Sequence, residues 1–132
     1  MKQAKYNAVD LAKYIVTKCT KEDCPISNLQ LQKILYYIQR EFLKNDIPAF
    51  SNRIEAWQFG PGVPEVYTYT VSFDMDKQDR KTIDKIVEDK RDLYPWDLVR
   101  DTHQKNGAWY KIYDNGNGNH KKIDNSLIKT LG

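Results

Sequence analysis

The chain has 132 residues, with 21 lysines and arginines against 18 aspartates and glutamates, and a formal net charge of +3. Its 40% hydrophobic and 12% aromatic content excludes a disordered chain, and its length excludes two domains of ordinary size. The longest apolar run is too short to cross a bilayer, and the first residues lead into no secretion signal. We therefore expect a cytoplasmic protein with a single domain, residues 1–132.

The cysteines, histidines and charges indicate neither a disulfide framework nor a metal site. Cys19 and Cys24 predict one thiol in the core of a helix and one near a turn. His103 and His120 repeat no paired ligand spacing, so no metal is expected. Basic residues are concentrated in neither half of the chain, and the isoelectric point of about 8.7 is low for a nucleic-acid-binding domain. No cofactor is expected either, and nucleic acid is not an expected partner.

The first fifty residues predict two helices. Residues 7–21 carry a wide apolar stripe at helical spacing, which indicates the first helix. Ser27 and Gln30 form a capping-box pattern, in which each side chain satisfies a main-chain group of the other, and a second helix begins here. The core face of the second helix consists of Leu31, Ile34, Leu35, Ile38 and Phe42.

A second stripe on this helix mixes amide and aromatic side chains. It consists of Gln32, Tyr36, Gln39 and Leu43, at four-three-four spacing. Two interpretations remain open at this point. Either the stripe faces a partner protein, or Tyr36 and Leu43 widen the core face while the two glutamines lie at its rim.

The middle of the chain combines a short strand with an unusual loop. Turn chemistry in residues 45–48 ends the second helix. Residues 53–59 alternate imperfectly, which predicts a short strand with one aromatic side. The prolines and glycines of residues 60–64 predict a rigid, bent loop. Pro64 suits the first position of a short third helix that would extend through Tyr69.

The second half of the chain predicts further short elements. Dense charge from residue 76 onward, with a narrow apolar seam, is typical of a solvated surface helix. Pro95 begins another helix, in which Trp96, Leu98 and Val99 supply apolar area, and a turn or two of helix surrounds Trp109.

The C-terminal part predicts a turn, a strand and a final helix. Asn and Gly residues at 115–119 predict a tight turn. A brief strand over 121–123 would pair with the strand near Trp57, and Asp124 would cap the last helix. Together the elements predict a predominantly α-helical α+β fold: a single compact domain of about five to seven helices with a small two- or three-stranded sheet.

No catalytic set is visible in the sequence. Asp101 and His103 are two residues apart on a predicted helix, so their side chains point in different directions. No nucleophile stands beside a base, and no cofactor loop is present. We therefore expect a protein without enzymatic activity.

Two motifs nevertheless resemble a known family. The first is Leu31-Gln32-Lys33 followed by Leu35-Tyr36, and the second is Glu55-Ala56-Trp57 followed by Gly60-Pro61, Val63-Pro64 and Val66-Tyr67. They resemble the Panacea domain, the family of GepA-like phage-associated proteins and SocA-like antitoxins. The resemblance continues through Trp96-Asp97-Leu98, Thr102-His103 and Trp109, and covers nearly the whole chain.

The chain departs from the family pattern at three places. Phe59 stands where tyrosine is usual. Gly62 replaces an apolar residue, which is expected to loosen the loop between the prolines. Ala108 stands where proline usually precedes the late tryptophan, and the spacing from His103 is stretched by one residue, which leaves the geometry around His103 and Trp109 open.

The resemblance implies a mostly helical domain without catalytic activity that neutralises a protein toxin encoded by an adjacent gene. It also implies that some members act as proteolytic adaptors, which would add a cellular protease as a partner. No membrane partner is implied. The alternative is a DNA-binding or phage-encoded regulatory protein without a dedicated helix-turn-helix.

The predicted partner-binding surface joins the second helix to the segment after it and to two later residues. It comprises Gln32, Lys33, Tyr36, Gln39, Trp57, Phe59, Pro61, Pro64, Tyr67, His103 and Trp109. Tryptophan and tyrosine supply large rigid area with a polar group, and the prolines lower the entropy lost on binding. The segment from Trp57 to Tyr67 is equally compatible with a structural corner packed on the second helix.

Overall fold

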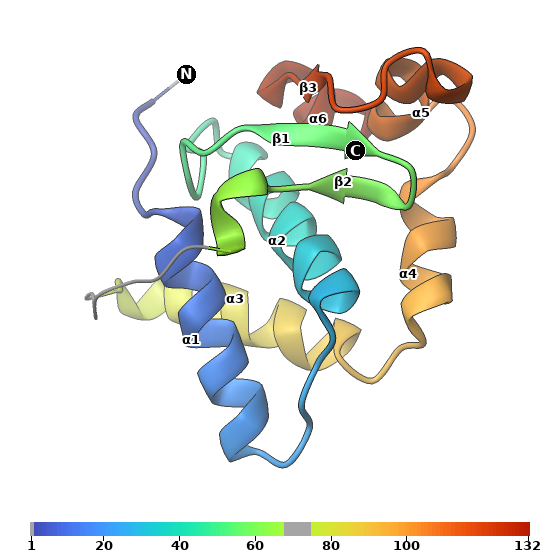
Figure 1. The fold of residues 1–132 in the computed structure, drawn as a ribbon. Coiled ribbons are helices and arrows are strands. Elements are labelled where there is room, and N and C mark those ends of the chain that lie inside the picture. The colour runs from blue at the N-terminus through green and yellow to red at the C-terminus, as the bar shows by residue number, and fades with distance from the viewer. Residues whose placement is uncertain (1, 68–74) are drawn as a thin grey trace.

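A computed structural model describes residues 2–67 and 75–132 (Figure 1). In chain order its elements are α1 (Ala8–Lys21), α2 (Asn28–Leu43), β1 (Ile54–Trp57), β2 (Gly60–Gly62), a 3-10 helix (Pro64–Tyr67), α3 (Lys77–Lys90), α4 (Pro95–Thr102), α5 (Ala108–Tyr113), a second 3-10 helix (Asp114–Gly116), β3 (Lys122–Ile123) and α6 (Asn125–Leu131). The predicted α+β fold, mainly helical, is confirmed. The sheet shows that the chain is not all-helical.

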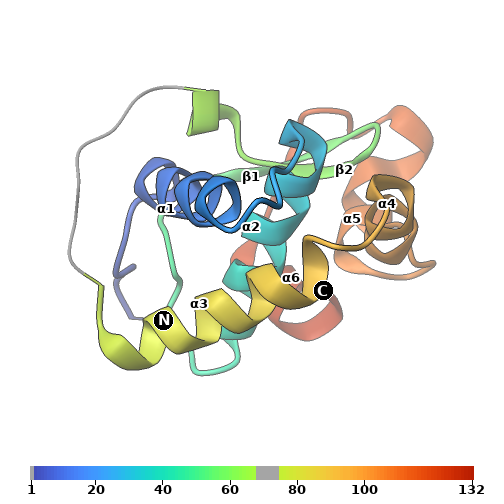
Figure 2. The same cartoon turned by 90° about the horizontal axis from the view of Figure 1, so that it is seen from below.

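Helix α2 lies at the centre of the molecule. It contacts α1, α3, α4, α6 and β2, and in Figure 2 α1 lies to one side of it and α4 and α5 to the other. Every residue from 31 to 39 is buried, followed by Phe42 and Leu43. A helix that is covered on all sides buries polar positions together with apolar ones. This explains why α2 buries several polar side chains in addition to the apolar stripe that predicts its core face.

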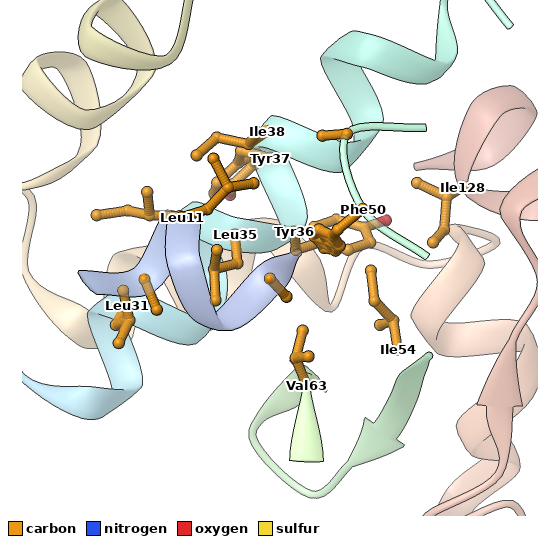
Figure 3. Packing of buried hydrophobic residues seen from close by; sticks show 14 of the residues in the cluster. Leu11, Leu31, Leu35, Tyr36, Tyr37, Ile38, Phe50, Ile54, Val63 and Ile128 are labelled. Carbon is orange, nitrogen blue, oxygen red and sulfur yellow. The ribbon is translucent and has the colours of Figure 1, made fainter. Parts of the chain in front are cut away.

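The apolar core forms around α2. Leu11 of α1, Leu35 of α2 and Val63, which follows β2, belong to one cluster of buried side chains (Figure 3). Ile54 of β1 and Ile128 of α6 join the same cluster. The core therefore ties the first helix, the sheet and the last helix to α2.

The predicted helix starts are confirmed for α1 and α2. The side chain of Asn7 accepts a hydrogen bond from Val9 N at 2.8 Å at the start of α1. At the start of α2, Ser27 and Gln30 form the capping box in both directions. Such caps satisfy main-chain N–H groups that have no partner within the helix. The cysteines also lie as expected, with Cys19 buried, Cys24 half-buried and both thiols free.

The three strands form one antiparallel sheet in the order β2-β1-β3. Ile54 pairs with Ile123, which confirms the predicted pairing between the early strand and the C-terminal one. The prediction of a bent loop over residues 60–64 is wrong for residues 60–62, which form β2 and pair with β1. Pro61 fits there because β2 is an edge strand and proline lacks only the N–H that an edge does not need.

Two other element boundaries differ from the prediction. Strand β1 ends at Trp57, because Gln58 and Phe59 form the turn and Gly60 follows it with a φ of +112°. The predicted third helix is a 3-10 helix that ends at Tyr67. Tyr69 and the side chain of Tyr67 lie outside the described part of the chain.

The surface helices largely follow the prediction. In α3 only Ile83 and Val87 are buried, which agrees with a narrow apolar seam. Pro95 is the first residue of α4, as expected. Of the three residues expected to supply apolar area in this helix, Leu98 and Val99 are buried, whereas the side chain of Trp96 is 58% exposed.

Gln39 joins α2 to the segment that leads into the sheet. It is fully buried, and its Oε1 accepts hydrogen bonds from Ala49 N at 2.8 Å and Phe50 N at 3.2 Å. Its Nε2 donates to Phe50 O at 2.9 Å. One amide thus satisfies three main-chain groups that would otherwise be buried without partners.

We expect Gln39→Ala to lower the free energy of unfolding by about 3 kcal/mol, because these main-chain groups lose their partners. Urea denaturation followed by circular dichroism measures this change. The matched control is Gln78→Ala on exposed α3, which should change stability by less than about 0.5 kcal/mol. Equal effects of the two substitutions would contradict the role assigned to Gln39.

Candidate partner-binding site

Two polar side chains of α2 bind the outer edge of strand β2. Gln32 Oε1 accepts a hydrogen bond from Val63 N at 2.7 Å, and Lys33 Nζ donates to Pro61 O at 3.1 Å. Both side chains are 1% exposed. An edge strand presents unpaired main-chain groups, and here a helix supplies their partners in place of another strand.

Strands β1 and β2, with the turn between them, form a hairpin. Two further helices hold the turn of this hairpin. Trp109 Nε1 of α5 donates to Trp57 O at 2.7 Å. His103, at the end of α4, interacts with the Phe59 main chain, and this interaction raises the pKa of His103 against the larger effect of burial. Together with Lys33 and Pro61, these contacts fix every second residue from 57 to 61, each from a different helix. We call Lys33, His103 and Trp109 the hairpin clamp.

The two aromatic members of the clamp are stacked on each other. The His103 and Trp109 rings lie 3.6 Å apart and nearly parallel, at 3°. The stretched spacing therefore does not separate them, and Ala108 takes the first position of α5, which suits proline. Burial, aided by the charge of Lys33, lowers the pKa of His103 below its ordinary value. His103 Nε2 is buried with no hydrogen-bond partner among the described residues.

Lys33 carries a buried ammonium group without an ion-pair partner in the described residues. The group has one hydrogen bond, to Pro61 O, and burial alone lowers its pKa to about 8. A nearby carboxylate would raise the pKa instead. A buried lysine without a counter-ion costs stability at neutral pH, so this position is a candidate functional residue as well as a structural one.

The stability of the chain should therefore depend on pH through Lys33. Between pH 8 and 10.5 the folded chain binds fewer protons at this group than the unfolded chain, so stability rises with pH across that window. Below pH 8 the buried charge costs about 3 kcal/mol. We expect Lys33→Met to be about 2 kcal/mol more stable than the parent chain at pH 7, after loss of the bond to Pro61.

This advantage should shrink nearly to zero by about pH 10, where most of the penalty is gone. Urea denaturation of both proteins from pH 7 to 10 measures the difference between their free energies of unfolding. Other titrating groups affect both proteins equally, so their contribution cancels in this difference. A variant that is less stable than the parent at pH 7 would show that the bond to Pro61 outweighs the buried charge.

Two glycines allow the hairpin to lie against its neighbours. A Cβ on Gly60 would lie 2.7 Å from both Lys33 Cε and Thr102 Oγ1. A Cβ on Gly62 would lie 2.1 Å from Trp57 Cε3, so the indole ring occupies the space beside this residue. The expectation that Gly62 loosens the segment is therefore wrong, because Gly62 lets the Trp57 ring pack closely on β2.

We expect Gly60→Ala to destabilise the chain by about 3 kcal/mol, from an unfavourable φ and from the contact with Lys33. The matched control is Gly116→Ala. Its φ of +101° is similar, but its nearest neighbour would lie 4.0 Å away. The control should cost only about 1 kcal/mol, for the backbone alone. Thermal and urea unfolding measure both, and equal losses would contradict close packing at Gly60.

The held hairpin leaves a group of aromatic side chains exposed. Phe59 is 45%, Tyr94 76% and Trp96 58% exposed. The Phe59 and Trp96 rings meet edge to face, with centroids 5.4 Å apart and planes at 82°. We call these three residues the aromatic patch. It joins the hairpin turn to the start of α4, two segments that are distant in sequence.

Sequence analysis did not include Tyr94 and Trp96 in the site. The helical spacing of α4 could have indicated that Trp96 is exposed, because Leu98, Val99 and Thr102 are the buried residues of this helix. Trp96 lies off this face at the second position of the helix. The expectation that Trp96, Leu98 and Val99 supply apolar area did not separate buried positions from exposed ones.

A cavity of about 340 Å³ lies beside the aromatic patch. It is lined by Asn28, Leu29, Gln32, Lys33, Trp57, Gln58, Phe59, Asn119 and His120. Phe59 belongs both to this cavity and to the patch. We call this cavity the Lys33 pocket.

The structure brings most of the predicted site residues to the hairpin, but buries many of them. Six are buried: Gln32, Lys33, Tyr36, Gln39, Pro61 and Trp109. Three are half-buried, namely Trp57, Pro64 and His103, while Phe59 is exposed and the side chain of Tyr67 is not described. The glutamines lie inside the core rather than at its rim. Partner contact by the buried residues stays a prediction, and in this structure they would act through the hairpin they hold.

A comparison with known protein families matches the segment that contains these motifs. Residues 31–110, from α2 to α5, match the model of the family described as antitoxin SocA-like, Panacea domain. The chain belongs to this family, as the resemblance predicted. The matched segment contains the hairpin, the clamp and the aromatic patch.

A curated relative carries the antitoxin description itself. Antitoxin SocA of Caulobacter vibrioides (strain NA1000 / CB15N) is 43% identical over 58 residues, which cover 43% of this chain and 31% of SocA. The match thus spans about a third of that relative's length. No solved structure matches the chain. Within the described residues, none of the helices is long and apolar enough to cross a membrane.

Proposed function

We propose that this chain is an antitoxin that neutralises a protein toxin by binding it directly through the aromatic patch. The observation that carries the proposal is the exposed edge-to-face pair of Phe59, in the turn of the hairpin held by its neighbours, and Trp96, at the start of α4. The family of the chain and the description of SocA support the antitoxin role.

The patch has the chemistry of a binding surface. Tryptophan and tyrosine supply large contact area with few rotatable bonds, and they are enriched among residues that dominate binding energy. The clamp fixes the main chain beneath Phe59 before a partner arrives. Little conformational entropy is then lost at the hairpin on association.

The polar groups beside the patch are engaged in structural contacts rather than arranged as a catalytic pair. Asp101 accepts hydrogen bonds from Tyr37 and from Gln104 Nε2, while His103 stacks on Trp109. Neutralisation by binding needs no reacting group. The proposed partner is the product of the adjacent reading frame, and the proposed compartment is the cytoplasm.

Co-expression with that product tests the proposal. The product alone should arrest growth, and this chain should restore growth and co-purify with the product. Because Phe59 and Trp96 are exposed, Phe59→Ala and Trp96→Ala should keep the fold but weaken binding at least about 10-fold and reduce rescue. Calorimetry on the purified pair measures the dissociation constant.

The matched control is Val16→Ala, which removes an exposed apolar side chain from α1, on another side of the molecule. It should leave binding and rescue unchanged. Rescue that persists without Trp96 and Phe59 would show that another surface binds the toxin. If growth is restored while the amount of toxin in the cell falls, the chain delivers the toxin to a protease. The dissociation constant does not report this outcome, so the amount of toxin is measured as well.

A further inference from the structure

The Lys33 pocket combines a buried positive charge with an opening beside the aromatic patch. Lys33 is one of the side chains that line it, and Lys33 Nζ uses one of its three N–H donors on Pro61 O. No carboxylate of the described residues pairs with it. The hairpin's own carboxylate, Glu55, is held by Arg53 at 3.1 Å, Trp57 Nε1 at 3.0 Å and His120 at 3.6 Å.

The position of the pocket on α2 adds to its positive character. Asn28 and Leu29, the first two residues of α2, line it together with Gln32 and Lys33. The positive end of the helix dipole therefore lies at the pocket, which is also lined by Lys33, a lysine without an ion-pair partner in the described residues. Both features favour an anionic occupant.

The remaining walls are suited to a side chain that joins an apolar stem to a single charge. Leu29, Trp57 and Phe59 provide apolar surface, and Gln58 and Asn119 provide amide groups. A phosphate group is commonly held by arginines or several main-chain N–H groups. Here a single lysine supplies the buried charge, and His120 is already beside Glu55. One carboxylate on a short stem is the better match.

We infer that the Lys33 pocket receives an aspartate or glutamate side chain of the toxin, whose carboxylate pairs with Lys33 Nζ. The inference rests on the proposed function for the identity of the partner. Phe59 belongs to both the pocket and the patch, so one toxin segment can cover the patch and insert the acidic side chain beside it. Such a pair supplies on binding the counter-ion that the free chain lacks.

A small-molecule titration tests the pocket without the toxin. The probes are N-acetyl-glutamate methylamide and, as the neutral control, N-acetyl-glutamine methylamide. Nuclear magnetic resonance follows the Lys33 side chain and the Trp57 indole. The acidic probe should shift both signals saturably, the neutral probe should shift neither, and Lys33→Met should abolish the indole shift. Absence of a shift, or an equal shift with the neutral probe, would overturn the inference.

Inorganic phosphate at equal ionic strength is the third probe. A phosphate response stronger than the glutamate response would show that the pocket prefers phosphate, and would overturn the assignment of a protein carboxylate. Lys81→Met, on exposed α3, is the matched charge control and should leave all titrations unchanged. Urea denaturation of Lys33→Met confirms that loss of binding does not come from unfolding.

The second arm uses the product of the adjacent reading frame. Lys33→Met should weaken its binding at least about 30-fold, whereas Lys81→Met should not. One glutamate-to-glutamine or aspartate-to-asparagine change in the toxin should weaken binding to the parent chain but not to Lys33→Met, a coupling that a double-mutant cycle measures. Failure of the adjacent product to bind at all would contradict the proposed function, while the small-molecule arm still decides the pocket.

Discussion

The structure depends on hydrogen bonds between polar side chains of α2 and the main chain of residues 49–63. Gln39 binds residues 49 and 50 before the sheet, and Gln32 and Lys33 bind Val63 and Pro61 at its edge. The bonds to Val63 and Pro61 fill main-chain positions that another strand would fill in a larger sheet, and those of Gln39 satisfy buried main-chain groups before the sheet. A central helix thus specifies the path of a segment that has little regular structure of its own.

This constraint links the fold to the proposed surface. The hairpin has only short strands, and two strands of this length are not stable alone. Contacts from α2, α4 and α5 hold it, and the Phe59 and Trp96 side chains become exposed together as a result. Under the proposed function, many motif residues serve binding indirectly, because they position the few exposed side chains that a partner can reach.

At Lys33, stability and the proposed recognition of an acidic side chain oppose each other. Its bond to Pro61 helps to hold the hairpin, but its burial without a carboxylate lowers its pKa to about 8 and penalises the charged form. An apolar residue of similar length would avoid that penalty. The proposed recognition of an acidic side chain gives a reason for a lysine at this position, because that recognition uses the positive charge.

Local patterns in the sequence predicted much of the fold. The capping box at Ser27 and Pro95 at the start of α4 are set by short-range chemistry, and both were predicted correctly. The pairing of β1 with β3 was also predicted correctly, although it joins segments that are far apart in the sequence. The strand at Gly60–Gly62 was missed, because glycine and proline disfavour strands unless an edge and outside partners accommodate them.

The site was harder to predict than the fold. Residue types in the motifs indicated the right region, but burial depends on what covers α2, and that is set by tertiary packing. Gln32 and Gln39 therefore resembled a partner-facing stripe, although both are buried. Trp96 was predicted only to supply apolar area, and its exposure follows from the positions of Leu98 and Val99, which form the buried face of α4.

Amide hydrogen exchange of the free chain tests most directly whether α2 holds the hairpin. The Val63 N–H has its hydrogen bond to the Gln32 side chain rather than to another strand. The account predicts that this amide exchanges as slowly as the core amides of α2, and that Gln32→Ala accelerates its exchange while the α2 amides stay protected. Fast exchange of Val63 in the parent chain would contradict the account, because the hairpin would then open without α2.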